Sequence, residues 1–122
     1  MCKVFFVVTS CAEEQPKLTW VFKLAKSAAV RGSLVGIALV NDSVYLARPE
    51  ILHGIRSLGN ETVASCLDWF KANAKNSKFM ASASCCKDRG LAVNELDDFW
   101  VMASEEDILD CITQANARVV TF

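Results

Sequence analysis

The chain has 122 residues, of which 52% are hydrophobic and 22% charged, and its formal net charge is −1 at pH 7. This length suits one domain with its own core, so we expect residues 1–122 to form a single domain. A near-neutral chain without a basic stripe is not expected to bind nucleic acid, because phosphate binding depends on clustered lysine and arginine.

The first half of the chain reads as strand, helix, strand. Residues 3–9 are an uninterrupted apolar run rich in Val and Phe, which predicts a strand buried on both faces. A helix should follow, since Pro16 suits a helical first turn and Gly32 suits a helix stop. Residues 34–40 predict a second buried strand, and the polar residues 41–43 predict a loop after it.

The second half continues the alternation. A short amphipathic piece lies between Pro49 and Gly59, and Asn60 is expected to cap the next helix. The remaining elements are predicted as a helix over residues 63–74, strands over residues 78–82 and 99–103, a helix capped by Ser104, and a strand over residues 118–122.

This alternation of helices with continuously apolar strands predicts a three-layer α/β/α fold with a five-stranded, mainly parallel sheet. In such folds ligands gather beyond the carboxyl ends of the strands. The loops at residues 10–15, 41–45 and 82–89 should therefore share one rim, which places Cys11 and Cys85 on it.

The six cysteines do not indicate a secreted disulfide framework, because the apolar run at residues 4–8 is short for a signal peptide. Cys66 and Cys111 fall on apolar faces of predicted helices and are expected to be buried. With His53 as the one histidine and no pair of Cys-x-x-Cys elements, neither a metal site nor a cofactor is expected. No segment approaches a membrane span of about 18 apolar residues, so we expect a cytoplasmic protein without membrane contact.

Cys85 is the candidate nucleophile. It follows small residues at 81–84, which let the backbone turn sharply, and it should lie near a helix N-terminus that favours a thiolate. Arg89 adds positive charge and is a candidate for holding a thiolate or an anionic substrate. Cys86 should point elsewhere and be buried, whereas Cys11 is a candidate partner thiol from the neighbouring loop.

Three segments carry a resemblance to a known family: KVFFVVTS at residues 3–10, the small-residue turn ending in KDRGL at residues 87–91, and ARVVTF at residues 117–122. With them the chain resembles, over nearly its whole length, the DsrE/DsrF-like family, which includes the TusD-type sulfur-relay proteins. Relay members carry sulfur as a persulfide on a cysteine before an Arg-Gly element. Counting back from that element places the first family cysteine on Ser82 and a second one on Cys85, so this chain departs from the pattern at position 82.

The resemblance implies a sulfur carrier that takes sulfane sulfur onto Cys85 from a donor protein and passes it to an acceptor. This chemistry needs an exposed thiolate and access for another cysteine. Two alternatives remain: a non-enzymatic subunit whose rim binds a small ligand or a protein, which the serine at position 82 favours, and a redox protein that pairs Cys85 with Cys11. Both the apolar fraction and the resemblance predict a homo-oligomer, with Trp69 and Trp100 in its contact.

Overall fold

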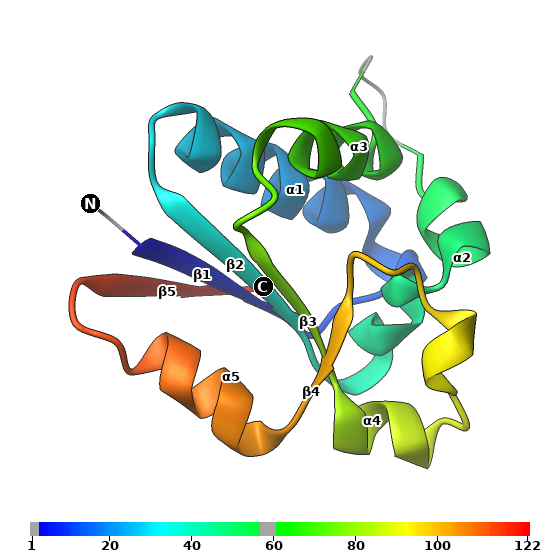
Figure 1. Ribbon diagram of the computed structural model, residues 1–122. Coiled ribbons are helices and arrows are strands. Elements are labelled where there is room, and N and C mark those ends of the chain that lie inside the picture. Colours follow the sequence, from blue (N-terminus) through cyan, green and yellow to red (C-terminus); the bar gives the residue numbers. More distant parts are fainter. Residues whose placement is uncertain (1–2, 57–60) are drawn as a thin grey trace.

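A computed structural model describes residues 3–56 and 61–122 of the chain (Figure 1). Its sheet has five strands in the order β4-β3-β2-β1-β5, and every neighbouring pair is parallel. The strands are β1 (Lys3–Val8), β2 (Leu34–Leu39), β3 (Lys78–Ser82), β4 (Val101–Ala103) and β5 (Ala117–Thr121). The predicted parallel sheet is confirmed, and β4 is two residues shorter at its start than expected.

Eight helical elements connect the described strands: η1 (Ala12–Glu14), α1 (Gln15–Val30), η2 (Asn41–Ala47), α2 (Pro49–His53), α3 (Val63–Asn73), α4 (Ala83–Asp88), η3 (Val93–Glu95) and α5 (Glu105–Ile112). Gly32 follows α1 at a φ of 92°, a left-handed conformation that glycine adopts at little cost. Thr62 caps α3 through a reciprocal pair of hydrogen bonds with Ser65. The expected cap, Asn60, lies outside the described residues; the capping position belongs to Thr62.

The helices cover both faces of the sheet, which makes the three layers (Figure 1). One face carries α1 and α3 over a large core, and α5 packs on the other face against a smaller cluster that includes Phe5, Met80 and Cys111. A Cβ on Gly36 would lie 2.1 Å from the Phe5 ring, so the missing side chain is what lets this ring lie across β2. No helix in the described part of the chain is long and apolar enough to cross a membrane.

Trp100 belongs to the core rather than to the surface. Its side chain is 3% exposed, and its ring centroid lies 5.0 Å from that of Phe79 and 6.3 Å from that of Phe22. The prediction that Trp100 contributes to a subunit contact is therefore wrong, because the chain before β4 turns this ring into the core beneath α1. Trp69 is partly buried, and Trp20 on α1 is the exposed tryptophan, at 59%.

Candidate functional site

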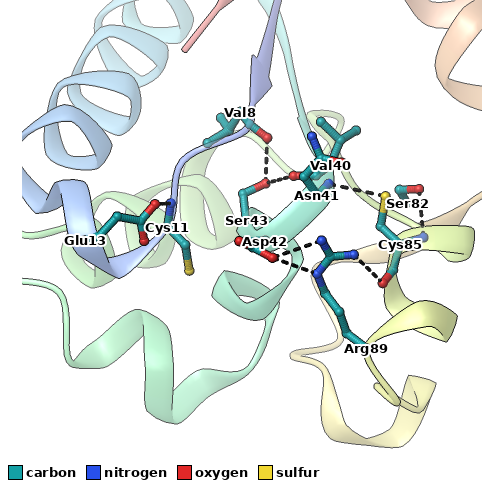
Figure 2. A network of polar contacts seen from close by, with 10 residues as sticks. All are labelled: Val8, Cys11, Glu13, Val40, Asn41, Asp42, Ser43, Ser82, Cys85 and Arg89. Atoms are coloured by element: carbon teal, nitrogen blue, oxygen red, sulfur yellow. Dashed lines mark hydrogen bonds and ion pairs between the residues drawn. The ribbon is translucent and has the colours of Figure 1, made fainter.

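The carboxyl ends of β2 and β3 lie side by side, since Leu39 pairs with Ala81. The 3-10 helix η2, which follows β2, therefore meets α4, which follows β3, and this contact brings a backbone amide to a thiol. The N–H of Asn41 donates a hydrogen bond to Sγ of Cys85 at 3.2 Å (Figure 2). Asn41 has a φ of 55°, a left-handed conformation that asparagine tolerates better than most residues.

Cys85 is the third residue of α4, as the predicted turn requires, but its surroundings differ from the expectation. Its own N–H donates to Oγ of Ser82 at 3.3 Å, so Ser82 acts as the N-cap of α4. Ser82 is 5% exposed, and its Oγ also lies 3.3 Å from that of Ser84. The donor observed at the sulfur thus comes from the first residue of η2 rather than from the end of its own helix.

Arg89 lies beside Cys85 and is held from two sides. Its Nη1 donates to the carbonyl oxygen of Cys85 at 3.2 Å, while its Nε and Nη2 approach Oδ1 of Asp42 at 3.0 and 2.9 Å (Figure 2). The hydrogen bond with Asp42 raises the pKa of the guanidinium above its ordinary value. The positive charge predicted near the thiol is therefore present, but it is paired with the carboxylate of Asp42.

Ser43 fixes η2, the 3-10 helix that carries Asn41 and Asp42 where a loop was predicted. It is fully buried, and its hydroxyl lies 2.5 Å from the carbonyl oxygen of Val8 and 2.8 Å from that of Val40. These contacts anchor the start of η2 to the ends of β1 and β2, so the residues that reach Cys85 and Arg89 start from a fixed point.

Among the five described cysteines, Cys85 alone is not buried. Burial raises the pKa of the Cys11, Cys66 and Cys86 thiols, and that of Cys66 reaches about 11. The predicted burial of Cys66, Cys86 and Cys111 is confirmed, at 0%, 0% and 4% exposure. Cys2 lies outside the described residues.

Cys11 lies on the same rim but is separated from Cys85. Its N–H donates to Oε1 of Glu13 at 3.1 Å, and its side chain is 7% exposed. Besides burial, the charges of Glu13 and Asp42 raise the pKa of its thiol. Figure 2 shows Ser43 and Asp42 between the two cysteine side chains, and both cysteines are free. This arrangement gives no support to a Cys11–Cys85 redox pair.

The sequence reading placed residues 41–45 on the rim but gave no role to Asn41 or Asp42. One pattern in the sequence could have identified them: these polar residues directly follow a buried strand, and the parallel neighbour of that strand leads into the cysteine turn. That β2 and β3 are neighbours is a property of the sheet order.

A pocket lies away from the thiol, between α5 and the edge formed by β3 and β4. It has a volume of about 530 Å³ and combines apolar residues such as Met80 and Val101 with charged ones such as Lys78 and Asp107. Cys111 lines it, whereas Cys85 does not. Within residues 3–56 and 61–122, no three His, Cys, Asp or Glu side chains gather in a way that could hold a metal ion.

The fold is shared with solved structures of other proteins. The YchN protein of E. coli matches with a TM-score of 0.78 and 18% sequence identity, over 100% of both chains. MTH1491, a protein of unknown function from Methanobacterium thermoautotrophicum, matches with a TM-score of 0.69 and 10% identity, again over 100% of both chains. No family model matches the sequence, and no curated protein matches it either. At these identities the likeness shows the fold alone, and it agrees with the predicted three-layer α/β/α arrangement.

Proposed function

We propose that this protein carries sulfane sulfur as a persulfide on Cys85 and passes it to a thiol of a partner protein. The observation that carries the proposal is the hydrogen bond from the Asn41 N–H to Sγ of Cys85. A fixed amide donor favours an anionic sulfur, and a thiolate is the form that attacks a sulfur–sulfur bond.

The exposure of the cysteines also supports Cys85 as the residue that carries the sulfur. Cys85 is partly exposed, whereas Cys11, Cys66, Cys86 and Cys111 are buried. A sulfur relay needs contact with a second protein's thiol, and among the described cysteines Cys85 is the one that such a thiol can approach.

The proposed exchange keeps its electrons balanced. The Cys85 thiolate attacks the outer sulfur of a donor persulfide, a new sulfur–sulfur bond forms on Cys85, and the donor leaves as a thiolate that takes up a proton. In the second step the acceptor's thiolate attacks the outer sulfur on Cys85, and Cys85 leaves as a thiolate. Neither step needs an external oxidant or reductant.

Incubation with a persulfide-generating donor, followed by peptide mass spectrometry, tests the proposal. The peptide that contains Cys85 and Cys86 should gain the mass of one sulfur atom. Cys85→Ser should abolish this gain, whereas Cys86→Ser should preserve it because Cys86 is buried. An unmodified wild-type peptide after treatment with several competent donors would contradict the proposal.

A second candidate function is a subunit that binds a small ligand, which the pocket beside α5 favours. Its volume of about 530 Å³ lies in the range of small-molecule sites, and it combines apolar and charged lining residues. A bound compound should raise the melting temperature. Val101→Trp should abolish that rise by filling the pocket at a residue that is 61% exposed, while leaving persulfide formation on Cys85 unchanged.

A further inference from the structure

We propose that Asp42 acts as a gate for anionic substrates of Cys85. In the free protein its carboxylate pairs with the Arg89 guanidinium, and the carboxylate of an anionic sulfur donor takes its place. The inference rests on the proposed function of Cys85 and names the class of substrate, a small persulfide that carries a carboxylate. The residues that carry it are Asp42, Arg89 and Cys85.

The two partners of the ion pair differ in how firmly they are held. The side chain of Arg89 is 23% exposed and is also hydrogen-bonded to the carbonyl oxygen of Cys85, whereas that of Asp42 is 68% exposed. An ion pair this open to water contributes little, since solvent and salt screen it. Asp42 is therefore the replaceable partner, and Arg89 is the fixed one.

The position of Arg89 places the proposed site for the anion next to the Cys85 thiol. Its guanidinium contacts the backbone of the residue that bears the sulfur, so an anion bound there lies close to Sγ of Cys85. Asp42 directly follows Asn41, whose amide contacts that sulfur. One short stretch of chain thus supplies both the donor to the sulfur and the carboxylate that neutralises the nearby cation.

Paired alkylating reagents test the gate without requiring persulfide chemistry. Iodoacetate is anionic and iodoacetamide is neutral, yet both need the same thiolate, so the ratio of their rates at Cys85 cancels any change in thiolate fraction. Asp42→Asn should raise the iodoacetate-to-iodoacetamide ratio about two- to fivefold, the range expected from one exposed ion pair. Arg89→Gln should lower the ratio below its wild-type value, and Arg89→Lys, which keeps the positive charge, should lower it less.

A matched control separates the gate from a general loss of negative charge. Asp88 is an exposed residue of the same segment, so Asp88→Asn removes one charge without touching the Arg89–Asp42 pair. Its effect on the ratio should be clearly smaller than that of Asp42→Asn. In an Arg89→Gln background, Asp42→Asn should have no more effect than Asp88→Asn has in the wild type.

The proposal is overturned if Asp42→Asn and Asp88→Asn change the ratio equally, or if the effect of Asp42→Asn persists without Arg89. Loading with glutathione persulfide then separates the two levels. Persulfide on Cys85 with no effect of Asp42 on the ratio leaves the carrier function standing and removes the gate. A charge-selective Cys85 that never accepts sulfur keeps the gate and removes the carrier function.

Discussion

The backbone amide of Asn41 lies 3.2 Å from Sγ of Cys85, although 44 positions separate the two residues in the chain. The contact joins the end of β2 to the start of α4 and exists because β2 and β3 are parallel neighbours. It gives the partly exposed Cys85 an anion-stabilising donor. Burial, in contrast, raises the pKa of the Cys11, Cys66 and Cys86 thiols above the ordinary value of a cysteine.

Cys85 should be the most reactive thiol of the folded protein. Alkylation over a graded series of pH values, with each cysteine followed by peptide mass spectrometry, should label Cys85 first. Cys66 should resist labelling below pH 10, because the pKa of its thiol is about 11 and its side chain is buried. Labelling of Cys66 or Cys111 ahead of Cys85 would show that the site has been assigned to the wrong cysteine.

Asn41→Ala should destabilise the protein by about 1 kcal/mol, because alanine lacks the short polar side chain that lets asparagine tolerate a φ of 55°. Relief of that strain should move the amide from Cys85 and slow its alkylation. Asn41→Gly retains both the N–H and the left-handed conformation, so it should keep the wild-type rate. Urea unfolding and iodoacetamide kinetics on the two variants measure these effects, and equal behaviour of Ala and Gly would contradict the expectation.

Ser82→Ala should cost about 1 kcal/mol of stability, because it removes the side-chain acceptor that caps α4. Ser84→Ala is the control for loss of a hydroxyl, since Ser84 is exposed on the same helix and contacts Oγ of Ser82 at 3.3 Å but accepts from no backbone N–H in the described contacts. Its free energy of unfolding should stay within about 0.5 kcal/mol of the wild type. Equal losses in the two variants would mean that Ser82 does not act as a cap.

Stability should fall at alkaline pH in a way that depends on Cys66. Its thiol has a pKa of about 11 in the folded protein and about 8.5 when unfolded, so above pH 8.5 the unfolded state binds fewer protons. The stabilisation is complete below pH 8.5 and is lost as pH rises toward 11, and roughly 2 kcal/mol should disappear between pH 8 and 10.5. Urea unfolding of wild type and Cys66→Ala over this range should give a steeper pH slope for the wild type; parallel slopes would rule out this origin.

We propose that the protein forms a homo-oligomer through the edge that β5 provides. This strand ends the sheet, and Val119 and Val120, which point to opposite faces, are 44% and 37% exposed. Light scattering should give a mass above that of one chain, and Val119→Lys should lower it. Val93→Lys is the matched control, because Val93 is also exposed, at 66%, but lies in η3, outside the sheet. A single-chain mass for the wild type at micromolar concentration would refute the proposal.

Much of the fold could be predicted from local patterns. The apolar runs, the Gly32 stop, the Ser104 cap and the bounds of β3 are properties of short segments, and the structure confirms them. Trp100 was misplaced because its local pattern suits either a strand or a surface. Its burial depends on how residues distant in the chain, such as Phe22, approach it.

The sequence by itself determined the alternation of elements, the parallel sheet and the place of Cys85 at the start of a helix, because hydrophobic periodicity and turn chemistry act over a few residues. Only the tertiary structure decided what surrounds the sulfur. Asn41 reaches Cys85 and Asp42 reaches Arg89 because β2 and β3 are neighbours in the sheet, and this order results from the packing of the whole chain. The chemistry of the rim therefore depends on contacts between residues more than 40 positions apart, which no local pattern encodes.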